Sequence, residues 1–153
     1  MTDVPSRMDM SLVPGDPLAH RALDSLLRAE ASVRRRLTAD LEREGVSASG
    51  FSVLVVLTTA GGELELRTLR ARLRTSKANA TEVVTTLESR GLVTRARMPS
   101  DRRAATVAVT ERGRALVERL FPEHTRRVAD AFAVLDESEK RSLASICRKL
   151  AAV

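Results

Sequence analysis

The stretch LESRGLVTRARMPSDRR, residues 87–103, determines how the rest of the chain is interpreted. A helical pattern ends at Gly91, an extended segment with arginines follows, and Pro99, Ser100 and Asp101 have the composition of a turn. A second extended segment, residues 104–109, is placed to return antiparallel to residues 92–98. The stretch therefore predicts a β-hairpin that follows a helix and carries several fixed positive charges.

Helical periodicity predicts helices on both sides of this hairpin. Four precede it, at residues 17–44, 48–59, 66–73 and 77–90, and two follow it, at residues 111–133 and 137–150. Polar residues suited to helix caps stand at their starts: Asp16, Ser47, Ser76, Thr110, and Asp136 with Glu139 as a capping box. The predicted fold is mainly α with one small β-hairpin, which is an α+β fold.

Composition excludes several classes of protein. The chain has 153 residues, of which 43% are hydrophobic, so it fits one domain with a core. Aromatic residues make up 2%, which disfavours proteins that bind single strands by base stacking. We find neither a membrane-spanning run nor a signal pattern, and we expect a flexible leader at residues 1–15 and a cytoplasmic location. One cysteine, Cys147, excludes an intramolecular disulfide and a multi-cysteine zinc site, and no cofactor or metal is expected.

The positive charge of the chain is local. The net charge is +6, yet residues 66–103 hold ten Lys or Arg and three acidic residues, so the rest of the chain carries −1. A concentrated positive surface is typical of a protein that binds a polyanion such as DNA. The alternative is a solvated charged face with no partner.

Residues 66–73 and 77–90, joined by a tight turn, have the pattern of a helix-turn-helix. The second helix of such a unit places its first residues near the bases of the DNA major groove. We expect DNA contacts from Arg74 in the turn and from the outer face of the second helix, at Ser76, Lys77, Asn79 and Thr81. The alternative is that these residues form only the solvated face of an amphipathic helix.

A hairpin that follows such a helix is a wing, and its arginines can enter the narrow minor groove. Candidate contacts on residues 92–109, called the wing below, are Arg95, Arg97, Arg102 and Arg103. Asp101 is expected to pair with a nearby arginine and fix the shape of the loop. An ordinary solvent-exposed turn is the alternative.

The stretch LESRGLVTRARMPSDRRAATVAVTERG, residues 87–113, resembles the helix end, wing and following cap of MarR-type transcriptional regulators. The matching positions are Leu87, Glu88, Gly91, Leu92, Val93, Arg95, Asp101, Arg103, Thr110 and Gly113. The chain departs from the pattern at four positions, where Arg74 replaces the usual glycine, Thr75 an apolar residue, Glu82 a common basic residue and Val109 a leucine.

The resemblance implies a winged helix-turn-helix DNA-binding lobe at about residues 47–110 within a single domain, residues 16–153. Helices at about 16–45 and 111–153 would form a homodimer. In support, apolar residues of the terminal helices would be partly stranded in a monomer: Leu116, Leu120, Val128, Phe132, Leu143, Ile146 and Leu150. The resemblance also implies a repressor that binds a pseudo-palindromic operator in double-stranded DNA.

Regulators of this family are often released from DNA by a small, commonly anionic or phenolic effector. By resemblance, the effector pocket would include Arg21, Arg28, Phe51 and Arg95.

Other functions stay open as alternatives. Cys147 could sense peroxide, although packing in the core is the expected role of a lone cysteine. His20 and His124 are expected at the surface or at the dimer interface rather than at a metal. A winged helix could also serve as a protein-interaction module without an effector. We expect no enzyme, because no phosphate loop, nucleophile elbow or metal motif is found.

Overall fold

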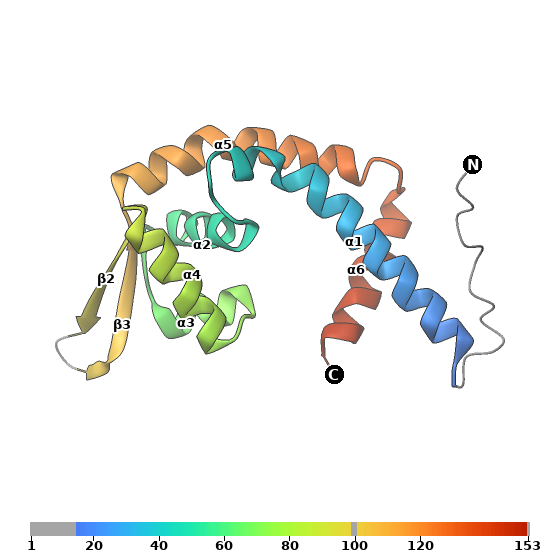
Figure 1. The fold of residues 1–153 in the computed structure, drawn as a ribbon, viewed down its shortest axis with the longest axis horizontal. Coiled ribbons are helices and arrows are strands. Elements are labelled where there is room, and N and C mark those ends of the chain that lie inside the picture. Colours follow the sequence, from blue (N-terminus) through green and yellow to red (C-terminus); the bar gives the residue numbers. More distant parts are fainter. Residues whose placement is uncertain (1–14, 99–100, 153) are drawn as a thin grey trace, which may run out of the picture. The chain divides into compact units, whose positions relative to one another are not determined.

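The structure is a computed structural model that describes residues 15–98 and 101–152 (Figure 1). The elements are α1 (Pro17–Arg43), α2 (Ala48–Thr59), β1 (Glu63–Glu65), α3 (Leu66–Leu73), α4 (Lys77–Ser89), β2 (Val93–Met98), β3 (Asp101–Val109), α5 (Glu111–Ala131) and α6 (Glu137–Ala151). The chain divides into two compact units between Arg36 and Leu37, and each is described by itself. None of the helices described here is both long and apolar enough to cross a bilayer.

The helices begin at the caps that the sequence predicted. Asp16 Oδ1 accepts hydrogen bonds from the backbone N–H groups of Leu18 and Ala19, at 2.9 and 3.1 Å. Asp136 and Glu139 form the expected capping box. The hydroxyls of three further residues each accept from the N–H group three positions later, at 3.0, 3.2 and 3.1 Å: Ser47, Ser76 and Thr110. Each of these bonds satisfies a donor that the first helical turn leaves unpaired, which fixes the helix start.

The sheet has three strands in the order β1-β3-β2, all antiparallel. The predicted hairpin is confirmed as β2 and β3, with Arg95 opposite Val107. The sequence analysis did not predict β1. This strand pairs with the other edge of β3, where Leu64 lies opposite Val107. A three-residue strand is too short to show alternation, and it exists because β3 supplies its hydrogen-bond partners.

The core lies between α2, α3, α4, α5 and the sheet. Helices α2, α3 and α4 and the central strand β3 each contribute fully buried side chains: Leu54, Leu57, Leu69, Val84 and Val107. Helix α2 is apolar on nearly every side and is central, as its sequence predicted. Figure 1 shows α3 and α4 beside α2, with the β2–β3 hairpin extending from the same lobe.

The apolar residues of the terminal helices divide into two groups. Leu116 and Leu120 are only 8% and 9% exposed, so the prediction that they are stranded in one chain is wrong. They are buried because α5 packs against α2 within the same unit. Helix α6 has no buried residue, and its side chains at Leu143, Ile146 and Leu150 are 38%, 56% and 59% exposed.

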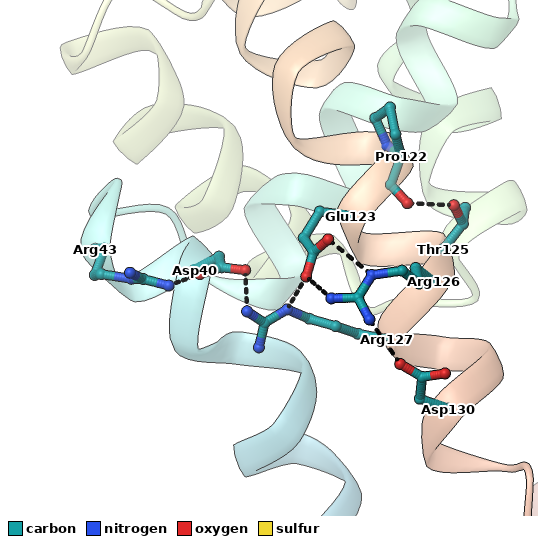
Figure 2. Close-up of polar contacts among 8 residues, drawn as sticks. All are labelled: Asp40, Arg43, Pro122, Glu123, Thr125, Arg126, Arg127 and Asp130. Carbon is teal, nitrogen blue, oxygen red and sulfur yellow. Dashed lines mark hydrogen bonds and ion pairs between the residues drawn. The ribbon is translucent and has the colours of Figure 1, made fainter.

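A network of ion pairs joins the last turns of α1 to α5 (Figure 2). Arg127 lies between Asp40, at 2.6 Å, and Glu123, at 3.1 Å. Glu123 also pairs with Arg126 at 2.6 Å, and Arg126 pairs with Asp130 at 3.0 Å. The Asp40 and Arg127 side chains are 20% and 28% exposed, so this contact is partly shielded from solvent. It holds residues 37–43 of α1 against the helix that follows the wing.

Candidate nucleic-acid interface

The turn between α3 and α4 depends on Arg74, which adopts a left-handed conformation with φ +50° and ψ +43°. Of the residues in the described ranges, it is the one non-glycine residue with positive φ. The N–H group of Thr75 then donates to the carbonyl of Arg70 at 3.3 Å, which closes the end of α3. A non-glycine residue in this conformation lowers the free energy of unfolding by about 1 kcal/mol. The exposed guanidinium group of Arg74 lies just before the start of α4.

The first turn of α4 presents polar side chains in a fixed arrangement. The Ser76 hydroxyl accepts from the N–H group of Asn79, and the Asn79 amide donates to the Thr75 hydroxyl at 2.6 Å. Ser76, Lys77 and Asn79 are all exposed. The helix N-terminus also carries partial positive charge, which favours phosphate. The structure therefore brings these three predicted residues together with Arg74 at one end of α4.

Thr81 is less available than the sequence predicted. Its hydroxyl donates to the carbonyl of Lys77 at 2.8 Å, and its side chain is half-buried. A threonine inside a helix can donate its hydroxyl proton to the carbonyl four residues earlier, so this donor is already used within α4. A contact from Thr81 to DNA would therefore use its methyl group or the hydroxyl lone pairs.

Arg95 on β2 is bound by Glu88 on α4. Oε1 of Glu88 accepts from the backbone N–H group of Arg95 at 3.1 Å, and Oε2 accepts from Nε and Nη2 at 3.0 and 2.8 Å. These bonds from Arg95 hold the pKa of Glu88 below its usual range. Arg95 is therefore paired with Glu88 between β2 and α4, and its predicted contact with DNA stays a prediction.

The remaining wing residues differ in what the structure describes. Arg97 is exposed on β2, opposite Ala105. The backbone of residues 101–103 forms the start of β3, but the side chains of Asp101, Arg102 and Arg103 lie outside the described part of the structure. Their predicted contacts, and the pairing of Asp101, stay predictions.

Not every cation in the basic segment faces solvent. Arg67, Arg72, Arg74, Lys77 and Arg97 are exposed, and Arg67 lies 3.4 Å from Glu65. Arg70 is half-buried, and its Nε is buried without a hydrogen-bond partner. The spacing of Leu66, Leu69, Arg70 and Leu73 places Arg70 on the inward stripe of α3, and this signal could have identified it.

No sequence motif indicates the contacts that hold the end of α4. Arg90, the C-cap of α4, donates from Nη1 to the carbonyl of Gly45 and from Nη2 to that of Glu44, the latter at 2.8 Å. The Glu44 carboxylate pairs with Arg119 on α5 through two hydrogen bonds. Arg119, with Arg90 and Arg43 nearby, holds the pKa of Glu44 below its usual range. These partners are 45 to 75 residues apart, so no local pattern predicts them.

The four candidate effector residues have separate surroundings. Phe51 is 3% exposed in the core, and its ring meets that of His124 edge to face at 5.1 Å. Arg95 is bound to Glu88. Arg21 and Arg28 are exposed on α1 in the other unit, where Arg28 pairs with Asp24 at 2.9 Å. The predicted effector pocket, with all four of its residues, stays a prediction.

Cys147 and the two histidines lie in different surroundings. Cys147 is exposed on α6, so the prediction of core packing is wrong, because α6 buries none of its residues within the chain. His124 is half-buried against Phe51, and burial lowers its pKa; its predicted place at the surface or at the dimer interface stays a prediction. His20 is exposed, as predicted. Within residues 15–98 and 101–152, no three His, Cys, Asp or Glu side chains are grouped to hold a metal ion.

Comparison with known proteins gives the family of this chain. The family model described as "MarR family" matches residues 46–105, which include α2 to α4 and most of the wing. The uncharacterized HTH-type transcriptional regulator YkoM of Bacillus subtilis is 30% identical over 122 residues, covering 80% of this chain and 79% of that protein. The chain belongs to the MarR family. This MarR-family protein is therefore a DNA-binding transcriptional regulator with a winged helix, and not an enzyme.

Solved structures agree with this fold. Sco3205, a MarR-family regulator from Streptomyces coelicolor in complex with DNA, has a TM-score of 0.77 at 24% identity, covering 98% of this chain and 91% of that chain. BpsR of Bordetella bronchiseptica, whose DNA binding is regulated by 6-hydroxynicotinic acid, has a TM-score of 0.73 at 25% identity, covering 86% and 98%.

Proposed function

We propose that this MarR-family regulator is a homodimeric repressor of transcription. In this proposal it binds a pseudo-palindromic operator through α4 and the wing, and a small anionic or phenolic effector releases it. The observation that carries the proposal is the exposed end of α4, where Arg74, Ser76, Lys77 and Asn79 stand together. An asparagine can hydrogen-bond adenine with its donor and its acceptor, and the cations suit phosphates.

The exposed apolar residues support a homodimer. Leu143, Ile146 and Leu150 share one face of α6, and Leu18, Leu23, Leu26 and Leu27 are 40% to 68% exposed on α1. Exposed apolar surfaces of this kind mark sites at which another protein chain packs. Two-fold symmetry then requires two half-sites, about one helical turn of DNA apart.

Support for an effector comes from a relative. BpsR, whose DNA binding 6-hydroxynicotinic acid regulates, shares this fold. An effector acts only if it binds the free and the DNA-bound arrangement with different affinity. The effector of this chain therefore has to contact an element whose position changes when α4 leaves DNA.

Operator binding tests the first part of the proposal. Fragments selected from genomic DNA should shift in a gel. If the protein makes about six to ten phosphate contacts, raising the salt from about 50 to 200 mM should reduce its affinity for DNA ~10³- to 10⁵-fold. Asn79→Ala should relax base preference, whereas Lys77→Ala should weaken binding to all sequences alike. Arg141→Gln, which removes an exposed ion pair with Glu137 on α6, is the matched control. Equal affinity of the parent for selected and random DNA would contradict sequence-specific binding.

The homodimer has its own test. Ile146→Asp should shift the protein from dimer to monomer in size-exclusion chromatography with light scattering, because a charge would replace an exposed apolar residue at the proposed interface. The same variant should lose operator affinity while keeping its helical circular dichroism. A parent protein that is monomeric at micromolar concentration would refute the dimer.

Redox sensing by Cys147 is the second candidate function. Cys147 is exposed, so peroxide could reach its thiol. If Cys147 is a sensor, peroxide should reduce operator affinity in the parent and leave Cys147→Ser unaffected. Equal responses of the two proteins would exclude it.

A further inference from the structure

A carboxylate, that of Glu82, stands in the middle of the outer face of α4. The residues that α4 buries all lie on one side of the helix: Ala80, Val84 and Leu87. Glu82 follows Ala80 by two residues, a rotation of about 200°, so it lies on the opposite side and is exposed. This is the side that a recognition helix turns toward the base edges of the major groove.

Glu82 has no partner in the part of the chain that the structure describes. Its side chain makes no hydrogen bond or ion pair there. The residues three and four positions away along α4 carry no positive charge: Ala78, Asn79, Thr85 and Thr86. Glu88, the other acidic residue of α4, is instead bound by Arg95. Facing DNA, an unpaired negative charge weakens binding unless it meets a hydrogen-bond donor.

The outer face around Glu82 offers hydrogen-bond acceptors rather than donors. The hydroxyl groups of α4 already donate to carbonyls of the helix, at 2.7 to 3.1 Å: Thr81, Thr85, Thr86 and Ser89. Their lone pairs and the carboxylate of Glu82 remain for a ligand. In the major groove, the donors are the amino groups of cytosine and adenine, whereas guanine and thymine present acceptors. This part of α4 therefore suits an amino group of a base.

Cytosine fits a carboxylate better than adenine does. The major-groove edge of cytosine has the N4 amino donor, whereas adenine places the N7 acceptor beside its amino group, where it opposes the second carboxylate oxygen. The position along the helix also fits. Glu82 lies about 4.5 Å further along α4 than Asn79, slightly more than the rise of about 3.4 Å between base pairs. The two side chains can therefore reach neighbouring base pairs.

We propose that Glu82 determines sequence specificity, and that its carboxylate accepts a hydrogen bond from the N4 amino group of a cytosine. This cytosine lies one or two base pairs from the base that Asn79 contacts. On other sequences the same charge faces phosphates and base acceptors without a donor, so Glu82 raises the ratio of specific to non-specific affinity. The role of Glu82 rests on the proposed binding of α4 to an operator.

Sites selected from a random double-stranded library test the base preference. In the parent, one position should favour cytosine about tenfold or more over guanine and thymine. Glu82→Gln should move this preference to adenine, because a glutamine amide can hydrogen-bond both N6 and N7 of adenine. Glu82→Ala should reduce the preference to within about twofold and bind random DNA about threefold more tightly, because a charge that repels phosphate is gone.

A modified operator tests the hydrogen bond itself. N4-methylcytosine still pairs with guanine, but its methyl group takes the place of the amino hydrogen that faces the major groove. At the selected position it should weaken binding of the parent about tenfold and change the affinity of Glu82→Ala by less than about twofold. 5-Methylcytosine keeps both amino hydrogens and is the control, for which the parent should lose less than about threefold.

Glu118→Gln is the matched control variant. It removes the same charge from α5, where the side chain of Glu118 is exposed and has no partner among the described residues. Its base preference and its affinity for random DNA should equal those of the parent. Because Glu82 makes no side-chain contact that holds the described fold, its variants should keep the melting temperature of the parent.

The outcomes separate this proposal from the proposed function. The role of Glu82 alone is rejected if the parent binds selectively but both Glu82 variants keep its base preference. Equal losses on N4-methylcytosine in the parent and in Glu82→Ala reject it too, as does selection of adenine by the parent at the position that Glu82→Ala relaxes. A parent that binds selected and random DNA equally rejects operator binding and the role of Glu82 together.

Discussion

Glu88 on α4 uses both carboxylate oxygens to hold Arg95 on β2, and one of the three bonds comes from the Arg95 backbone. The recognition helix and the wing are therefore joined by a contact between side chain and main chain, as well as by the short turn between them. Arg95, which the sequence predicted as a DNA contact, is therefore also a candidate for positioning the wing relative to α4.

Glu88→Gln should weaken operator binding by about three- to tenfold while leaving the dimer intact. The amide keeps one acceptor oxygen but loses the charge, so the wing is held less firmly relative to α4. Gel shifts measure the affinity for the operator. Hydrogen exchange of the β2 amides measures how firmly the wing is held against α4. Arg95→Lys should behave similarly, because lysine cannot form the paired bonds of a guanidinium. Unchanged exchange in β2 in both variants would contradict a positioning role.

The sequence predicts this fold well wherever the cause is local. Helix starts at Ser47, Ser76 and Thr110 depend on bonds to residues three positions later, and these are visible as short motifs. The hairpin was likewise predictable from alternation and from the turn residues. The start of α4 was found because the cap and the outer face are both local features.

The parts that the sequence did not predict depend on distant partners. The bonds of Arg90 to Gly45, the ring contact of Phe51 with His124 and the pairing of β1 with β3 all join segments far apart in the chain. Alternation placed Arg95 on one side of its strand but could not show that Glu88 binds it. For the same reason, α5 was expected to be more exposed than it is.

Arg74→Gly should stabilise the protein by up to about 1 kcal/mol and weaken DNA binding. Glycine adopts positive φ without steric cost, whereas Arg74 is held at +50°, and the substitution also removes an exposed charge. Arg72→Gly, inside α3, is the matched control and should destabilise by about 0.5–1 kcal/mol, because glycine is unfavourable in a helix. Chemical denaturation measures both. Equal destabilisation by the two substitutions would show that the conformation at Arg74 is not strained.

Gly113→Ala should destabilise the protein by about 1–3 kcal/mol, because the added methyl group has no space. A Cβ atom at Gly113 would lie 2.7 Å from Cγ2 of Val109 and nearer still to the carbonyl oxygen of Leu92. Gly50→Ala is the comparison, since its Cβ would meet side-chain atoms at 3.2–3.3 Å and helix propensity offsets the crowding. Denaturation curves should therefore show a much smaller change for Gly50→Ala. A similar change at both positions would mean that α5 can move away from Leu92.

His124 should make the stability of the protein depend on pH below neutrality. Burial lowers the pKa of His124 beneath its ordinary 6.5, so the folded state favours the neutral ring against Phe51. As pH falls through about 6.5, the unfolded chain takes up a proton before the folded one does, and the stability from this residue is lost until the folded pKa is passed. Comparing unfolding free energies at pH 8 and pH 5.5 should show a larger loss in the parent than in His124→Phe. Equal losses in the two proteins would show that burial of His124 is not linked to protonation, because the carboxylates that also titrate are common to both.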